Sequence, residues 1–174
     1  NTSNKPLNPV IYPMFSIGYL SWMNQSASYD ASLQCIVAKS VTPYQKTQDY
    51  PYISNLKDIT FFASQTAPDG FTCNYKKFLG EGHLCAPQGL LNGKLGEENA
   101  NYEVPVGVFQ YSLHCPPGET QTLNWRFGAV NKVEDIGPLI DFEASAKTPA
   151  SNTLRAVTLQ SPNSEFNDMV NNWL

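Results

Sequence analysis

Charge is scarce in this sequence, and the little that is present is spread out. Asp, Glu, Lys and Arg make up 15% of the residues, and 11 basic side chains stand against 15 acidic ones. Proteins that bind nucleic acid gather basic residues into a patch or stripe, so the scattered Lys and Arg predict no nucleic-acid partner. No apolar run approaches the ~20 residues that a membrane helix needs, so we expect no membrane partner either.

Motifs that hold metals are also missing. The four cysteines stand far apart and none belongs to a CxxC pair, so a structural zinc site is not expected. A domain of this size has enough core to fold without covalent cross-links, which favours free thiols, and two disulfides are the alternative. The four positions are Cys35, Cys73, Cys85 and Cys115.

Catalytic groupings are equally absent. His83 closely follows Glu81, but no third residue is placed to orient an acid–base pair. Glycosidase chemistry needs two carboxylates that face each other across a cleft, whereas Glu97 and Glu98 are adjacent and diverge in an extended segment. No Gly-x-Ser-x-Gly motif occurs. The residues themselves therefore predict no catalytic centre, no metal and no cofactor.

What the sequence does contain is the pattern of a β-protein. Apolar residues make up 41%, and 13 Pro and 11 Gly are spread along the chain, which fits short strands joined by turns. Residues 122–129 alternate polar and apolar side chains, as a half-buried antiparallel strand does. Residues 104–115 predict a second strand, with a β-bulge at Gly107. We expect a hairpin of these two strands, closed by Pro117-Gly118, with Leu113 and Leu123 in its two arms.

The remaining segments give a coarser picture. We expect an arm or loop at residues 1–9, a long surface loop at 42–58, and short strands at 33–37, 59–63 and 153–160. The predicted fold is a mainly β antiparallel sandwich over residues 1–160, followed by a linker-type amphipathic helix over residues 161–174. Apolar residues recur in this helix at helical spacing, which predicts one face buried against this domain or another chain. That face consists of Phe166, Met169, Val170, Trp173 and Leu174.

Loop aromatic residues give a weak indication of carbohydrate binding. Tyr75 and Tyr102 flank a glycine-rich stretch, and a tyrosine ring can stack on a sugar face while its hydroxyl stays in water. Glu81 and His83 lie within that stretch and complete the candidate carbohydrate-binding set. The alternative is that these aromatic residues anchor loops to the sandwich, since most aromatic surface in proteins is buried.

An ordered series of short motifs carries a family resemblance. The motifs are Lys77-Phe78-Leu79-Gly80-Glu81-Gly82, Pro105-Val106-Gly107, Pro116-Pro117-Gly118-Glu119, Phe127-Gly128-Ala129 and the closing residues 166–174. In this order they resemble the later part of the N-terminal β-sandwich domain of glycoside hydrolase family 94, the disaccharide and oligosaccharide phosphorylases. The resemblance covers residues 58–174 and implies an antiparallel super-sandwich.

The resemblance also implies a division of labour. In the family, a helical linker leads from the sandwich to an (α/α)6 barrel that carries the general acid and binds phosphate. Phosphorolysis there inverts the anomeric centre and releases an α-sugar 1-phosphate. No barrel motif occurs in this sequence, so the resemblance implies a non-catalytic domain that shapes the active site and the oligomer contact of a sugar phosphorylase.

The partners implied by the resemblance are a carbohydrate and a further domain or chain over the C-terminal helix, with a homodimer as one form of assembly. No cofactor is implied, and inorganic phosphate enters only as a co-substrate of a full enzyme. The family favours the cytoplasm, and secretion stays open. The alternative function is a stand-alone β-sandwich that binds carbohydrate or protein without an enzymatic partner domain.

Overall fold

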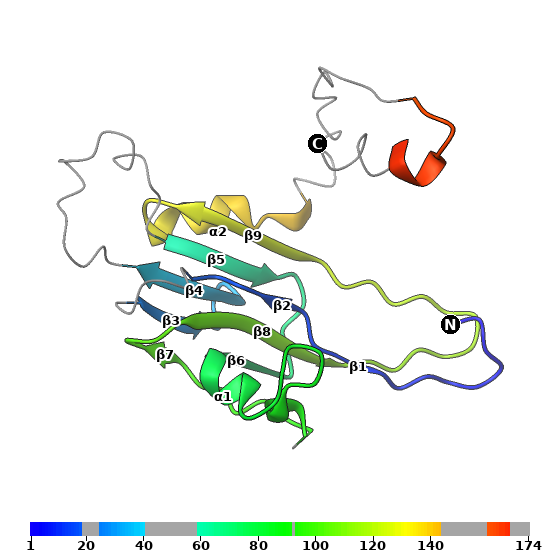
Figure 1. Ribbon diagram of the computed structural model, residues 1–174, viewed down its shortest axis with the longest axis horizontal. Helices are drawn as coiled ribbons and strands as arrows, with labels where there is room; N and C mark the ends of the chain where they lie inside the picture. The colour runs from blue at the N-terminus through cyan, green and yellow to red at the C-terminus, as the bar shows by residue number, and fades with distance from the viewer. Residues whose placement is uncertain (19–24, 41–58, 92, 144–159, 168–174) are drawn as a thin grey trace. The chain divides into compact units, whose positions relative to one another are not determined.

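The computed structural model describes residues 1–18, 25–40, 59–91, 93–143 and 160–167 (Figure 1). The chain forms two compact units, Asn1–Ile140 and Asp141–Leu174. The first unit contains two antiparallel β-sheets packed face to face, which confirms the predicted mainly β fold. The predicted domain division after residue 160 stays a prediction.

The first sheet is built around a long central strand, β8. Its members are β1 (Val10–Ile11), β2 (Met14–Phe15), β6 (Gly70–Asn74) and β8 (Pro105–Ser112). β1 and β2 pair with one side of β8 in a single continuous register, which ends with Phe15 opposite Gly107. They are two pieces of one edge strand, interrupted near Pro13, which has no N–H to donate. The Pro13 carbonyl still accepts the Phe109 N–H at 3.2 Å.

The second sheet has five antiparallel strands in the order β7-β3-β4-β5-β9. They are β3 (Gln25–Asp30), β4 (Cys35–Ser40), β5 (Ile59–Ser64), β7 (Ala100–Asn101) and β9 (Trp125–Val130). Strands predicted at 33–37 and 59–63 are therefore confirmed, with shifted ends. The turn between β3 and β4 is held by the Asp30 carboxylate, which accepts the Ser32 N–H at 2.9 Å and the Leu33 N–H at 3.3 Å.

The two sides of the sandwich differ. On one side the chain itself joins the sheets, because the Cys73 N–H of β6 donates to the Glu98 carbonyl at 2.7 Å and the segment after Glu98 becomes β7, which pairs with β3. The other side, called here the open side, carries β1, β2 and β9. Within the described residues no further strand pairs with their outer edges. The rings of Phe15 and Phe127 stack on this side.

The core between the sheets is aromatic. Phe62 of β5 stacks on Phe109 of β8, with ring centroids 4.8 Å apart. Buried Tyr111 has its hydroxyl satisfied, since it donates to Ser64 Oγ at 2.5 Å and accepts the Trp125 Nε1 hydrogen at 3.3 Å. A tyrosine can fill an apolar core only when its hydroxyl finds such partners.

Both sheets are also covered on their outer faces. α1 (Tyr75–Leu79) and η2 (Gln88–Leu90) cover the β8 sheet, and η3 (Val133–Asp135) and α2 (Ile136–Leu139) cover the five-stranded sheet. Val106 and Val108 face the first cover, whereas Phe109 and Tyr111 face the inner core. Burial of both faces of β8 explains the change of apolar parity near Gly107. A register irregularity between β6 and β8 lies opposite the same place, which agrees with the predicted bulge.

The predicted hairpin of the two clearest strands is wrong. β8 pairs with β1, β2 and β6, while β9 pairs with β5 in the other sheet. The turn at Pro116–Glu119 does form, with the Glu119 N–H donating to the Pro116 carbonyl at 3.2 Å, but residues 113–124 cross from one sheet to the other. Leu113 and Leu123 both pack against the inner core. Alternation identifies a strand that faces this core, and it does not identify the strand's partner.

The N-terminal residues run beside this crossing segment. Leu7 and Cys115 exchange two backbone hydrogen bonds, of 3.0 and 2.9 Å. The Asn1 side chain donates to the Cys115 carbonyl at 2.7 Å, and exposed His114 contacts Asn8 Oδ1 through Nδ1 at 2.7 Å. The arm is thus tied down by polar contacts. All four cysteines are free, as predicted, and Cys85 is exposed.

The second unit is described at residues 141–143 and 160–167. One helical turn lies at 164–167, and Asn163 caps it by accepting the Phe166 N–H at 3.0 Å. The predicted amphipathic helix is not confirmed beyond this turn. Phe166 is 46% exposed. Four other members of the predicted buried face lie outside the described residues, namely Met169, Val170, Trp173 and Leu174.

The predicted loop at 42–58 also lies outside the described residues, as does the predicted strand at 153–160 except for its last residue. Within the described part of the chain, no helix is long and apolar enough to cross a membrane.

Candidate functional site

The structure divides the four predicted carbohydrate-binding residues between two places. Tyr75 and Tyr102 each stand next to one member of a hydrogen-bonded pair, in which Asn74 Nδ2 donates to the Glu103 carboxylate at 2.8 Å. Tyr75 is half-buried and packs against the apolar cluster under α1, which favours an anchoring role. Tyr102 is 79% exposed.

Tyr102 also has an unusual backbone. Its φ is 56°, in the left-handed region that a bulky residue seldom adopts. The Glu103 carboxylate holds this turn by accepting from the Asn101 N–H at 3.4 Å in addition to the Asn74 amide. The fold therefore presents the Tyr102 ring to solvent at a cost in local backbone energy.

Glu81 and His83 lie in the loop between α1 and η2, and both are exposed. The loop is held by backbone groups. The Glu81 N–H donates to Gln88 Oε1 at 2.9 Å, and the Ala86 N–H donates to the His83 carbonyl at 2.8 Å. The structure does not bring these two side chains together with Tyr75 or Tyr102 around a pocket, and the contacts of the loop fit a structural role.

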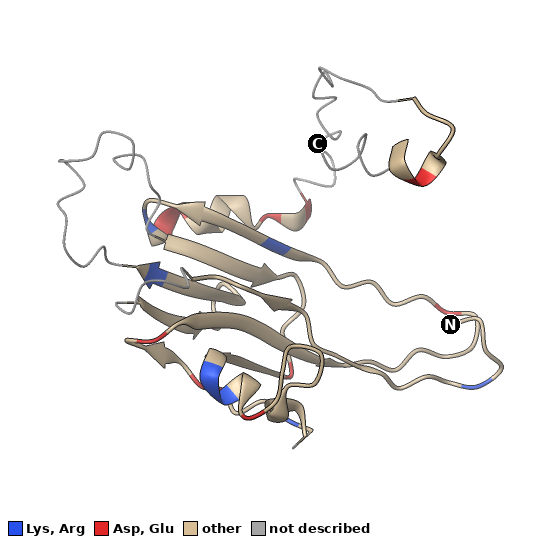
Figure 2. Ribbon diagram, in the orientation of Figure 1, with Lys and Arg blue, Asp and Glu red and all other residues tan. Residues whose placement is uncertain are grey.

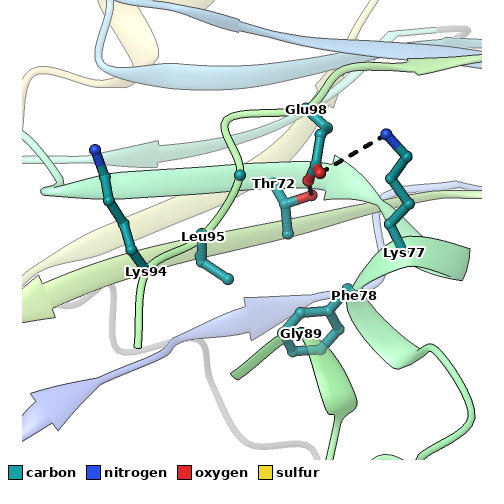
Figure 3. A pocket seen from close by; sticks show the side chains of 8 residues that line it. Thr72, Lys77, Phe78, Gly89, Lys94, Leu95 and Glu98 are labelled. Atoms are coloured by element: carbon teal, nitrogen blue, oxygen red, sulfur yellow. Dashed lines mark hydrogen bonds and ion pairs between the residues drawn. The ribbon is translucent and has the colours of Figure 1, made fainter. Parts of the chain in front are cut away.

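A small pocket lies beside this loop, between α1, η2, β6 and the segment of residues 94–98 (Figure 3). Its volume is about 130 Å³. The residues that line it are Thr72, Lys77, Phe78, Gly89, Lys94, Leu95, Gly96 and Glu98. None of the four predicted residues is among them.

Helix α1 supplies two of the residues that line the pocket, Lys77 and Phe78. Asn74 begins the helix, and its side-chain oxygen accepts the Lys77 N–H at 2.9 Å, as an N-cap residue does. Successive helical residues point about 100° apart. Phe78 is therefore buried against the β8 sheet, while Lys77 reaches the rim of the pocket.

Glu98 is the central polar group. Its Oε2 accepts the hydroxyl hydrogen of buried Thr72 at 3.1 Å, and its Oε1 lies 3.7 Å from Lys77 Nζ (Figure 3). Gly96 leaves room for this carboxylate, because a Cβ at position 96 would clash with the Glu98 carboxylate oxygens. The carboxylate is thus held by Thr72 of β6, and Gly96 in its own segment gives it room.

The segment that carries Lys94 and Leu95 is pinned from β8. Buried Gln110 accepts the Leu95 N–H at 2.8 Å and donates to the Gly93 carbonyl at 2.9 Å. Lys94 pairs with Glu97, with Nζ 3.5 Å from Oε1. A rigid segment of this kind holds polar groups in place before any ligand arrives.

The chemistry available at the pocket is hydrogen bonding. Its lysines donate, its carboxylate accepts, and Phe78 and Leu95 offer apolar surface. Within the described residues, no three His, Cys, Asp or Glu side chains lie close enough to hold a metal ion. The thiols with altered acidity lie in the core, where burial raises the pKa of Cys35 and of Cys73 to about 12.

Sequence reasoning missed this pocket. Thr72, Lys77 and Glu98 meet only because β6 pairs with the Glu98 segment, and no short motif contains all three. The glycine-rich stretch was the one available signal, since Gly89 and Gly96 both line the pocket.

Comparisons with known proteins agree with the fold. The family described as "Glycosyl hydrolase 94, supersandwich domain" matches residues 19–144, a region that contains the pocket and every strand from β3 to β9. A cellobionic acid phosphorylase from Neurospora crassa is 35% identical over 184 residues, and the alignment covers 100% of this chain and 23% of the relative. The chain spans about a quarter of that relative's length. The resemblance seen in the sequence is confirmed, and the chain belongs to glycoside hydrolase family 94, in its supersandwich domain.

Proposed function

We propose that this chain is the supersandwich domain of a disaccharide phosphorylase and that it works beside a separate catalytic domain. The observation that carries the proposal is the relative's 35% identity across the whole of this chain, in an alignment that covers 23% of that phosphorylase. A region of this extent leaves room in such an enzyme for a catalytic domain elsewhere in the polypeptide.

The proposed reaction is phosphorolysis of a glycosidic bond. Inorganic phosphate replaces the leaving sugar at the anomeric carbon, so a sugar 1-phosphate forms and the second sugar leaves with a hydroxyl group. The relative's name makes a cellobionic-acid-type disaccharide the first substrate to test. Phosphate acts here as a co-substrate, and no cofactor is required by the proposal.

A non-catalytic role for the domain itself has support in the site. The pocket places one carboxylate, Glu98, against a threonine and a lysine, and a second carboxylate across a cleft is not among its lining residues. Hydrolysis of a glycoside by side chains alone requires two such groups, so the pocket does not fit glycosidase chemistry, whereas in phosphorolysis phosphate itself is the nucleophile and the assay described below is the test. The domain would instead shape the entrance of an active site and the contact between subunits.

We further propose its partners. Tyr75, Glu81, His83 and Tyr102 are the candidate carbohydrate contacts, with exposed Tyr102 the best placed of them to stack on a sugar. A further domain or a second subunit would cover the face formed by Phe166, Met169, Val170, Trp173 and Leu174. The proposed compartment is the cytoplasm.

Two proteins test the proposal, the 174-residue chain and the product of the complete reading frame that encodes it. Each is incubated with phosphate and cellobionic acid or cellobiose, and sugar 1-phosphate is quantified. We expect release by the complete product and none by the chain. Release by the chain alone would overturn the non-catalytic role, and none by a complete product of phosphorylase length would overturn the proposed reaction.

A stand-alone binding module is the second candidate function, and the pocket is the observation that favours it. This second candidate function predicts a complete reading frame little longer than this chain. It also predicts carbohydrate or protein binding without phosphorolysis.

Size-exclusion chromatography with light scattering on the same two proteins shows whether either one forms the proposed homodimer.

A further inference from the structure

We propose that the pocket around Glu98 is a binding site for one neutral sugar ring. This inference goes beyond the proposed function, because it concerns a site contained in this chain and needs no catalytic domain. It rests on four properties of the pocket, which are the spacing of its polar groups, its charge, its apolar surface and its size.

The spacing of Lys77 and Glu98 fits a hydroxyl group. Their closest atoms lie 3.7 Å apart, which is beyond ordinary hydrogen-bond length, and Figure 3 shows the two groups facing each other over the pocket. The other carboxylate oxygen is already used by Thr72. A hydroxyl can accept from the ammonium and donate to the free oxygen at the same time, so one sugar hydroxyl would satisfy both groups.

The charge around the pocket favours a neutral ligand. Lys77 and Lys94 carry positive charge at the rim, and Glu98 and Glu97 pair with them. The four charges cancel. An anion such as phosphate would be attracted by the lysines but repelled by the Glu98 carboxylate. A cation would be attracted by the carboxylate but repelled by the lysines. A ligand with many hydroxyls and no charge avoids both penalties.

The pocket offers a sugar ring a small apolar surface. Phe78 and Leu95 are almost fully buried yet line the pocket. Sugar rings carry C–H groups on their faces and hydroxyls around their rims, and aromatic or aliphatic side chains pack against such faces. Glu98 and Lys77 lie on one side of Phe78 in Figure 3, so a ring that touches Phe78 would turn its hydroxyls towards these two groups.

The size of the pocket limits the ligand to about one ring. A volume of about 130 Å³ holds roughly four waters at ~30 Å³ each. A hexose ring with its hydroxyl groups is larger than this, so one ring would enter the pocket only in part, and the second ring of a disaccharide would extend outside it. We therefore expect similar affinity for a monosaccharide glycoside and for the disaccharide that contains it.

Protein-observed NMR on the full chain, with ¹⁵N labelling, tests the site. The probes are methyl β-glucoside, cellobiose, cellobionate and inorganic phosphate, each titrated to 50 mM. We expect methyl β-glucoside to shift the amide signals of residues 72, 77 and 94–98, with millimolar affinity. Cellobiose should bind about equally, and phosphate alone should leave these signals unchanged.

Matched variants separate binding from surface charge. Lys77→Gln and Glu98→Gln each remove one charged hydrogen-bonding group, and we expect each to weaken the glucoside about tenfold. Lys76→Gln is the control, because Lys76 is exposed on the same helix and does not line the pocket. Glu98→Gln keeps an acceptor for Thr72, and Lys77→Gln changes an exposed side chain, so at least one variant will stay folded.

Three results would overturn the proposal, and a fourth, given after them, would reject its neutral ligand. They are no shift with any sugar at 50 mM, shifts confined to residues outside the pocket, and equal losses in Lys76→Gln and Lys77→Gln. Binding of phosphate in preference to the glucoside would reject a neutral-sugar site. These outcomes are independent of phosphorolysis, so the site can fail while the proposed function holds, and the reverse.

Discussion

The ring of Phe127 stacks on the ring of Phe15, with centroids 4.2 Å apart, and this contact joins the edge strands of the two sheets. Phe15 lies in β2 and Phe127 in β9, and Phe15 in turn stacks on Phe62 of the core at 5.9 Å. Phe127 nevertheless remains 63% exposed. It is therefore an outer member of an aromatic row that leads from solvent at the open side into the core.

We predict that Phe127→Ser lowers the free energy of unfolding by about 1 kcal/mol, because stacked aromatic pairs contribute ~0.5–1.5 kcal/mol beyond their buried area. Urea unfolding measures the change. Leu91→Ser is the matched control, since Leu91 is 79% exposed and belongs to none of the three core clusters, and it should change stability by less than ~0.5 kcal/mol. Equal effects of the two substitutions would reject a role for the ring stack.

Tyr102 gives a prediction of opposite sign. Its left-handed backbone, with φ of 56°, is strained for tyrosine but easy for glycine, and its exposed ring offers little packing to lose. We expect Tyr102→Gly to raise the free energy of unfolding by ~0.5–1 kcal/mol. Asn101→Gly in the neighbouring strand β7 should instead destabilise the chain by a similar amount. A fall in melting temperature for Tyr102→Gly would show that the tyrosine ring stabilises the folded chain.

The strands were predictable from the sequence where their burial leaves a pattern. β9 alternates because one of its faces meets the inner core, and Trp125 packs against that core as expected. The pairing of β9 was not predictable, because both sheets present apolar faces to the same core, and alternation is the same for a strand in either sheet. Phe127 shows a further limit, since its place in the apolar pattern does not reveal that β9 ends a sheet.

The candidate site was less accessible to sequence reasoning than the fold. Tyr102 was identified as a loop aromatic, but its backbone strain depends on the turn that Glu103 and Asn74 hold. The pair of Thr72 and Glu98 depends on a bridge between distant segments. Long-range pairing of this kind leaves no local signature, whereas family resemblance, carried by ordered motifs, was visible at once.

Thiol reactivity should separate the cysteines. Burial raises the pKa of Cys35 and Cys73 to about 12, so both thiols stay protonated and unreactive at pH 8, where the thiolate is the nucleophile. Cys85 is exposed, and buried Cys115 donates its thiol hydrogen to the Glu119 carbonyl at 3.2 Å. Titration with a chromogenic disulfide reagent should label one thiol quickly and all four in urea.

Cys85→Ser is the control for the thiol prediction. It should remove the fast labelling of one thiol, called here the fast phase, and leave the labelling of the other three unchanged. Loss of the fast phase together with faster labelling of the rest would mean that the substitution loosened the core. In the wild-type chain, fewer than four labelled thiols in urea without reductant would contradict the free state of the cysteines.

Asp30 predicts a pH dependence. The hydrogen bond from the Ser32 hydroxyl, together with those from the Leu33 and Ser32 amides, lowers the pKa of the Asp30 carboxyl. A carboxyl whose pKa is lower in the folded state stabilises the fold above its unfolded pKa, and that contribution is lost as pH falls through the folded pKa. Asp30→Asn should therefore be less stable than the wild type at pH 7, with the difference shrinking towards pH 3.

Urea midpoints at the two pH values measure the Asp30 effect. Glu119→Gln provides the control for removal of a carboxylate, since the Glu119 side chain is exposed. A difference between Asp30→Asn and wild type that stays constant from pH 7 to pH 3 would indicate that shape, and not charge, matters in the turn between β3 and β4.

Gly96 allows the pocket to be altered with little damage to the fold. A Cβ at this position would clash with the Glu98 carboxylate, which is the far end of a flexible side chain and can move away. We expect Gly96→Ala to change the melting temperature by no more than a few degrees, since the lost glycine flexibility offsets part of the clash. The displaced carboxylate should leave Thr72 and Lys77, so the amide signals around both should shift and glucoside binding should fall at least tenfold.

Gly137→Ala is the matched control, because nothing lies within 4 Å of its added Cβ and helix α2 should gain ~0.5–1 kcal/mol. Unchanged glucoside affinity in a folded Gly96→Ala chain would mean that the Glu98 carboxylate does not contact the sugar.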